Sequence, residues 1–295
     1  MPQDNRHQPL SVFILHIDCI CAVRDSVSLR FYSLSTPAFY LVPPPSSSKL
    51  DMSSDAASAT SSHSSSSASP PSFNFSHADH HKHYSSMVPK FVPGVDTVHR
   101  LTAQLIAERA GADAHILVLG AGGGMELRSF ATLQSRWRFT GVDPSSSMLE
   151  QAKVVLGEDE SRVTWVNGVI TNAPAGPYGG ASCLMTLHML KDDGSKLDTL
   201  RELRGRLKPG AAFVLFDNCI DAGSEESTRQ LERYGRYALD YGVAAEMVEK
   251  NKANVRSMGT GITPQREEQL LSEAGFRDVE LLYAALSWRA WVAYA

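Results

Sequence analysis

Apolar residues follow two periods along residues 90–295, and the two periods alternate. The short apolar run at 116–119 is typical of a buried strand, whereas the spacing of Val98, Leu101 and Leu105 is that of one helix face. Strands are expected at residues 116–119, 138–143, 163–166, 181–186, 212–217, 279–284 and 288–293. Helices are expected between them, including residues 146–156, residues 196–207 and a segment from Pro264 to Gly275. Such alternation predicts a parallel sheet with helices on both faces.

The last two expected strands are separated by only a few residues. A parallel pair needs a crossover of about a dozen residues or more, so these two strands are predicted to pair antiparallel.

The first third of the chain lacks this pattern. Residues 46–76 are rich in serine, and such a segment cannot bury enough apolar surface to offset the entropy of ordering it. His16 and Asp18 interrupt an apolar run at residues 10–23, which disfavours a secretory signal. A histidine-rich tract at residues 77–83 is interpreted as a solvated polar segment. We therefore predict a disordered extension over residues 1–85 and one folded domain over residues 86–295.

Composition and charge exclude several classes of protein. Hydrophobic residues make up 43% of the chain and charged residues 20%, as in an ordinary globular protein. The formal net charge of -4 disfavours electrostatic capture of nucleic acid or of an anionic membrane. No apolar run is long enough to span a membrane. The four cysteines form no Cys-x-x-Cys pair, which indicates a reducing, cytoplasmic environment and no metal site.

A glycine-rich turn at residues 120–124 follows the first expected strand and opens a helix. Ligands of open parallel sheets bind at the carboxyl ends of the strands, where glycines allow positive φ and close approach of the backbone. Asp143 ends the next strand, and a carboxylate in that place can accept two hydrogen bonds from the vicinal hydroxyls of a ribose. The pair predicts a cofactor that contains a nucleoside.

The spacing of the glycines distinguishes between such cofactors. A dinucleotide site needs Gly-x-Gly-x-x-Gly, but the sixth position is Met125 counted from Gly120 and Leu127 counted from Gly122. No Gly-Lys-Ser/Thr follows, which also excludes a phosphate-binding P-loop. A glycine turn with a ribose-binding acid but without a pyrophosphate signature favours S-adenosyl-L-methionine.

With the turn and Asp143 in place, the chain resembles the class I S-adenosylmethionine-dependent methyltransferases over about residues 90–295. The blocks that bear the resemblance are VLGAGGG at 118–124, FTGVDPSSSMLEQA at 139–152, VTWVNGVI at 163–170, SCLMTLHML at 182–190, LKPGAAFVLFD at 207–217 and the segment 270–295. The resemblance implies a Rossmann-like, doubly wound, seven-stranded sheet with an antiparallel last strand, and a methyltransferase activity (EC 2.1.1.-). Within the family, MVPKFVPGVDTV is similar to the branch that contains the tRNA-uridine carboxymethyl-donor synthase.

The resemblance also implies which residues bind the cofactor. These are Gly120, Ala121, Gly122 and Gly124 in the turn, Asp143 at the ribose, Pro144, Met148, Gly168, Val169 and Ile170 around the adenine, and Thr186 and Leu187 at the methionine moiety. Three positions depart from the family pattern, because Val118, Val169 and Gly179 stand where an acid is frequent.

Methyl transfer from a sulfonium is an in-line displacement, so the protein mainly supplies proximity and orientation. His188 is our candidate for the general base or for positioning the substrate, and a helix-capping histidine is the alternative. Asp217 and Asn218 are candidates for lining the acceptor pocket, and a cap at the start of a helix is the alternative for Asp217. By the resemblance, Arg236 falls near the place where the carboxymethyl-donor synthase holds its extra carboxylate, and an amphipathic surface helix is the alternative for this insert.

The segment before the first helix offers a further candidate. Tyr84, Met87 and Phe91 are either a lid over the cofactor or packing residues.

Three functions remain open at this point. The first is methyl transfer to a small-molecule acceptor, the second is a synthase that modifies the cofactor itself, and the third is a non-catalytic protein that binds the cofactor. A nucleic-acid substrate is disfavoured further because TLHML at 186–190 stands where an Asn/Asp-Pro-Pro-Tyr motif would be expected. The oligomeric state stays open, with a homodimer as one option.

Overall fold

The computed structural model describes residues 84–221 and 224–295. The predicted disordered extension, with its apolar run and histidine-rich tract, lies outside the described residues except for its last two positions. The first described helix, α2, begins at Tyr84, next to the predicted domain boundary at residue 86. None of the described helices is long and apolar enough to cross a membrane.

Seven strands form a single sheet within the described part of the chain. The strands are β1 (His115–Leu119), β2 (Arg138–Asp143), β3 (Val163–Asn167), β4 (Tyr178–Leu184), β5 (Leu207–Asn218), β6 (Arg277–Ala285) and β7 (Trp288–Tyr294). The α-helices are α2 (Tyr84–Phe91), α3 (Val95–Arg109), α4 (Met125–Leu133), α5 (Ser146–Leu156), α6 (Ser195–Gly205), α7 (Glu225–Asp240), α8 (Ala245–Met258) and α9 (Pro264–Glu273). Short 3-10 turns are η1 (Gly157–Arg162), η2 (Ile170–Asn172) and η3 (Leu187–Met189).

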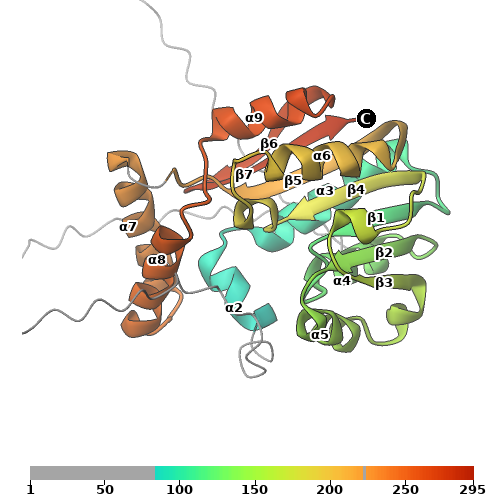
Figure 1. Ribbon diagram of the computed structural model, residues 1–295. Coiled ribbons are helices and arrows are strands. Elements are labelled where there is room, and N and C mark those ends of the chain that lie inside the picture. The colour runs from blue at the N-terminus through green and yellow to red at the C-terminus, as the bar shows by residue number, and fades with distance from the viewer. Residues whose placement is uncertain (1–83, 222–223) are drawn as a thin grey trace, which may run out of the picture. The chain divides into compact units, whose positions relative to one another are not determined.

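The strand order is β3-β2-β1-β4-β5-β7-β6 (Figure 1). Strands β1 to β5 are parallel, and β7 runs antiparallel to both of its neighbours. This confirms the predicted doubly wound sheet and its terminal antiparallel pair. The order reverses between β1 and β4, so the glycine-rich turn after β1 lies at the switch point where open α/β sheets bind ligands.

Alternating residues of each strand face two different helix layers. Leu117 and Leu119 of β1 belong to the same buried cluster as residues of α6 and α9, whereas Ile116 and Val118 cluster with α3 and α4. The period of two along a strand produces this division. Burial on both faces explains why these strands are continuous apolar runs in the sequence.

Strands β4 and β5 differ most from their predicted bounds. β4 begins at Tyr178, whose backbone N–H bonds to the Arg206 carbonyl 2.8 Å away, although Pro177 and two glycines suggest a turn there. It ends at Leu184 because Met185 turns the chain with a φ of 57°. β5 begins already at Leu207 and runs through the Lys208-Pro209-Gly210 segment, whose glycine N–H donates to the Ala295 carbonyl.

Helices α2, α7 and α8 stand beyond the carboxyl ends of β4 and β5 (Figure 1). They form one buried apolar cluster with the sheet, to which Phe91 of α2, Tyr234 of α7 and Val248 of α8 belong. The rings of Phe91 and Tyr234 are 5.4 Å apart. Phe91 therefore packs in the core, which agrees with the packing alternative for this residue.

The turn at 120–124 requires glycine at Gly124, which precedes α4. Its φ is +71°, and a Cβ there would lie 2.8 Å from the Cα of Ala152 in α5. A side chain would thus impose a left-handed strain and push α5 away from the turn.

We expect Gly124→Ala to lower the free energy of unfolding by about 2–4 kcal/mol, from left-handed strain and overpacking together. The matched control is Gly111→Ala, because Gly111 has no positive φ and no atom within 4 Å of an added Cβ. Urea unfolding of both variants measures the difference. Equal stability of the two variants would contradict the tight packing of α5 on the turn.

Candidate active site

The glycine-rich turn and Asp143 face each other across the carboxyl ends of β1 and β2. The backbone N–H of Gly122 donates to Oδ2 of Asp143 at 2.9 Å, and the N–H of Ser145 donates to Oδ1 at 2.8 Å. A Cβ on Gly122 would lie 2.6 Å from that carboxylate oxygen. Each oxygen thus accepts one backbone bond and keeps further lone pairs for a ligand.

Met148 closes the same corner from α5. A Cβ on Gly122 would lie 2.8 Å from the Cβ of Met148, and the Met148 carbonyl accepts a bond from Gly123 N–H at 3.1 Å. Burial raises the pKa of Asp143, while the two backbone N–H groups act in the opposite direction. The carboxylate is therefore held in a partly desolvated position at the turn.

Tyr84 of α2 lies over this turn. A Cβ on Gly123 would meet the Tyr84 ring at 2.6 Å, so the ring rests directly on the glycine backbone. Burial raises the pKa of Tyr84, and the nearby carboxyl groups of Glu126 and Asp143 add to the rise. Tyr84 therefore packs on the turn at which the cofactor is expected, and its role as a lid stays a prediction.

Glu126 brings a second buried carboxyl group to the site, from the first turn of α4. Its Oε1 accepts a hydrogen bond from the Ser182 hydroxyl of β4 at 2.7 Å. Burial raises the pKa of Glu126 to about 8, and the charge of Asp143 contributes to the rise. The sequence does contain a signal for this residue, because an acid directly after a glycine-rich turn falls at a helix N-terminus, where negative charge is favoured.

The segment after β4 meets the turn from the other side. A Cβ on Gly120 would lie 1.8 Å from Oγ1 of Thr186, which places Thr186 against the turn. The side chain of the next residue, Leu187, is fully buried in the core. His188 follows and extends the site toward β5.

His188 and Asp217 form a hydrogen-bonded pair at the carboxyl ends of β4 and β5. Nδ1 of His188 is 2.9 Å from Oδ1 of Asp217, and the Asp217 side chain is fully buried. Trp288 of β7 packs its ring at right angles to the imidazole, 5.7 Å away between centroids. A carboxylate that accepts from Nδ1–H fixes the tautomer in which Nε2 can accept a proton.

The residues expected around the adenine take up different positions. The backbone N–H of Gly168 donates to the Asp143 carbonyl at 3.0 Å, and Pro144 is exposed beside it. Val169 is exposed, and its N–H is bonded to Oδ1 of Asn172. Ile170 is buried in the apolar core. The ribose part of the expected site is thus assembled more completely than the adenine part.

Arg236 does not face this site. It lies on α7 with 77% of its side chain exposed, and its Nε bonds to Asp240 of the same helix. The amphipathic pattern of α7 puts Tyr234 inward and Arg236 outward.

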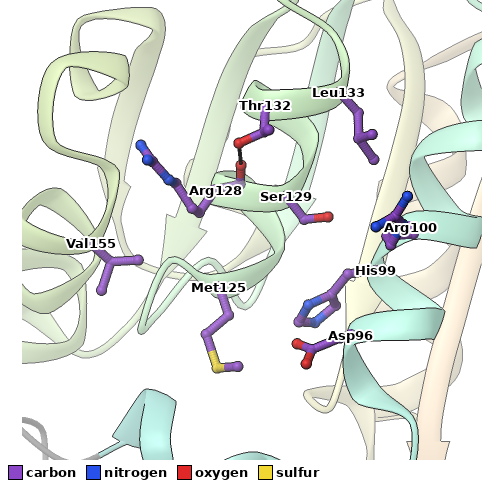
Figure 2. Close-up of a pocket in the computed structure, with 9 residues that line it drawn as sticks. All are labelled: Asp96, His99, Arg100, Met125, Arg128, Ser129, Thr132, Leu133 and Val155. Carbon is purple, nitrogen blue, oxygen red and sulfur yellow. Dashed lines mark hydrogen bonds between the residues drawn. The ribbon is translucent and has the colours of Figure 1, made fainter. Parts of the chain in front are cut away.

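Two grooves of the described region are lined by none of the residues 120–124 of the turn. One has a volume of about 360 Å³ and lies between α3 and α4, with His99 and Ser129 among its lining residues (Figure 2). The other, of about 540 Å³, lies at the amino ends of β1 and β5. Neither is lined by Asp143 or by the His188 pair.

Comparisons with known proteins agree with this geometry. A family model described as a methyltransferase domain matches residues 117–213, which run from β1 into β5. Residues 117–213 thus match a methyltransferase domain, and the fold is that of S-adenosylmethionine-dependent methyltransferases. S-Adenosyl-L-methionine is the cofactor of that class.

Particular relatives are distant. The carboxy-S-adenosyl-L-methionine synthase of Campylobacter curvus is 20% identical over 200 residues, which cover 68% of this chain and 85% of the relative. Human N-acetylserotonin methyltransferase, solved with S-adenosylmethionine, superposes with a TM-score of 0.51 at 19% identity and 74% coverage of this chain. An O-methyltransferase family 2 protein from Planctomyces limnophilus gives 0.52 at 14% identity and 76% coverage of this chain. This chain spans 56% and 63% of those two solved chains.

We expect Glu126→Gln to raise the free energy of unfolding above that of the wild type, and to do so more at pH 8 than at pH 5. The unfolded chain ionises this carboxyl group near pH 4.5, whereas the folded protein keeps it protonated up to about pH 8. The free energy of unfolding of the wild type therefore falls as the pH rises from about 4.5 to about 8. Glutamine cannot ionise, so Glu126→Gln escapes this fall and should be more stable than the wild type by about 1–3 kcal/mol at pH 8.

Urea unfolding at the two pH values tests this expectation. Glu150→Gln is the control, because that side chain is 70% exposed on neighbouring α5. A pH dependence of stability that is the same in Glu126→Gln and wild type would show that Glu126 ionises normally in the folded protein.

Proposed function

We propose that this protein transfers the methyl group of S-adenosyl-L-methionine to a hydroxyl group of a small-molecule acceptor. The observation that supports it is the His188–Asp217 pair, 2.9 Å apart, next to the segment that touches the glycine-rich turn. A hydroxyl acceptor must lose a proton during transfer, and an imidazole held by a buried carboxylate is a suitable general base. The solved protein of similar fold from Planctomyces limnophilus is named as an O-methyltransferase family 2 protein.

The cofactor supplies the electrophilic methyl group when it is bound. Asp143 would hold the ribose hydroxyls, and the bare backbone at Gly120 and Gly122 would allow the close approach of the methionine part. Tyr84 would cover the cofactor and exclude water, since its ring already rests on Gly123. The residues present therefore fit this cofactor.

His188 performs the proton transfer in this proposal. Asp217 accepts the Nδ1 proton of the imidazole, so Nε2 takes the proton of the acceptor hydroxyl. The deprotonated oxygen would then be the nucleophile for the methyl group that the cofactor would supply, and the sulfur would keep the electron pair of the carbon–sulfur bond. Burial of Asp217 strengthens its attraction for the imidazolium that results.

A second candidate is the synthesis of carboxy-S-adenosyl-L-methionine, because several relatives bear that name. This reaction predicts a cation next to the sulfonium, and Arg236 was the expected residue. Its exposed position on α7 favours methyl transfer instead. Mass spectrometry of the products distinguishes the two, since only the synthase adds a carboxyl group to the cofactor.

A cytoplasmic location suits this function. The buried thiols of Cys183 and Cys219 are free, as is usual for proteins of a reducing compartment.

We expect Asp143→Ala to weaken cofactor binding by about 1–3 kcal/mol, because two charge-assisted hydrogen bonds to the ribose are lost. Isothermal titration calorimetry with S-adenosyl-L-methionine measures the change. Asp198→Ala is the control, because it removes a carboxylate that is 76% exposed on α6. Unchanged affinity in a folded Asp143→Ala protein would remove this residue from the site.

We expect His188→Gln to lower the rate of methyl transfer about 10²–10⁴-fold, the usual contribution of a general base, with unchanged cofactor affinity. The assay follows uptake of label from methyl-labelled cofactor into a metabolite extract. His115→Gln is the control, because His115 lies at the opposite end of β1, bonded to Thr140. A wild-type rate of methyl transfer in His188→Gln would show that His188 is not the general base.

A further inference from the structure

The backbone beside the His188 imidazole is held by two side chains, one from the following helix α6 and one from a segment 72 residues further along the chain. Nζ of Lys196, on α6, donates to the Leu187 carbonyl at 2.9 Å. The hydroxyl of Thr260, between α8 and α9, donates to the carbonyl of His188 itself at 2.5 Å. The consecutive carbonyls of Leu187 and His188 in η3 thus each accept a hydrogen bond from a side chain of a different segment.

Lys196 is an unusual residue for such a contact, because its side chain is completely buried. Its nearest acid is Glu267 of α9, whose Oε1 lies 3.4 Å from Nζ. Burying a cation is costly unless other groups satisfy it. Here the Leu187 carbonyl is closer to the ammonium than Glu267 is. The Lys196 side chain thus connects α6 to η3 through Leu187 and to α9 through Glu267.

Thr260 is itself held in place. The next residue, Gly261, packs so closely on the segment after β5 that a Cβ would lie 2.0 Å from the Ile220 carbonyl oxygen. Since β5 also contains Asp217, the same strand end positions both partners of the imidazole. Thr260 fixes the backbone of His188 while Asp217 fixes its ring.

We infer that Thr260 and Lys196 are positioning residues, which hold the His188 backbone so that Nδ1 stays bonded to Asp217 and Nε2 faces the acceptor. This inference rests on the proposed role of His188 as the base. Neither residue touches the reacting atoms in this assignment. Their effect is to keep a surface-proximal imidazole in one orientation, because misplacement of a catalytic group by about 1 Å can cost roughly 10²-fold in rate.

Thr260→Val tests the inference, because it removes the hydroxyl but keeps the shape. The first readout is the ¹⁵N and proton NMR signal of His188 Nδ1–H, assigned with His188→Gln. We expect this signal to be sharp in the wild type and lost to exchange with water in Thr260→Val. Thr260→Ser, which restores a hydroxyl, should recover it.

The second readout is the rate of label transfer into the metabolite extract. We expect Thr260→Val to slow transfer about 10- to 100-fold with unchanged cofactor affinity, as for a displaced catalytic group. The control is Thr132→Val, which removes a hydroxyl bonded to the Arg128 carbonyl on α4 (Figure 2). The double variant Lys196→Met, Glu267→Gln, which leaves no unpaired charge, should show the same loss of the Nδ1–H signal.

The outcomes separate this inference from the proposed function. A wild-type Nδ1–H signal and rate in Thr260→Val would overturn the positioning role, while the rate of His188→Gln still decides the role of the base. Loss of the signal in Thr260→Val and its recovery in Thr260→Ser would show that Thr260 holds the imidazole, whereas a fully active His188→Gln would refute the base and with it the catalytic part of the inference. Melting temperatures of all variants identify a global loss of structure, which the double variant and Thr260→Ser would then have to separate from the local effect.

Discussion

The hydrogen bond from Gly122 N–H to the Asp143 carboxylate is the contact on which the site depends. It joins the turn after β1 to the end of β2, two segments that the parallel register already brings side by side. Because Gly122 has no side chain, the carboxylate can approach the backbone to 2.9 Å. One interaction thus sets the shape of the turn and the direction of the acid that would bind ribose. Loss of either partner would change both at once.

The site gathers buried acids that the fold alone would not favour. Glu126, Asp217 and Glu267 are all almost inaccessible to solvent, and burial raises the pKa of both Glu126 and Glu267 to about 8. Desolvated carboxyl groups oppose folding at neutral pH unless they are paired. Asp217 is paired with His188 and Glu267 with Lys196, whereas Glu126 accepts a hydrogen bond from Ser182, so each acid has a partner that offsets part of this cost. Carboxyl groups with shifted pKa values cluster at functional sites.

The sequence was informative where a local pattern determines structure. The bounds of β2 and of α5 follow from the apolar pattern alone, and Asp143 falls at the expected strand end. Partners that are distant in the chain could not be predicted, because no periodicity links Thr260 to His188 or Glu126 to Ser182. Arg236 was assigned to the synthase site from the resemblance alone, although the amphipathic pattern of its helix places this residue on the exposed face.

Two halves of the sheet contribute different parts of the proposed reaction. Strands β1 to β3 build the cofactor side around Asp143, and strands β4, β5 and β7 build the acceptor side around His188. Thr186 connects them, because its hydroxyl lies against Gly120 of the turn while His188 follows two residues later. The distance between a bound methyl group and the base is therefore governed by a short stretch of backbone, from Met185 with its positive φ to the carbonyl that Thr260 holds. Rigidity of that stretch would therefore fix the position of the proposed base relative to the methyl group.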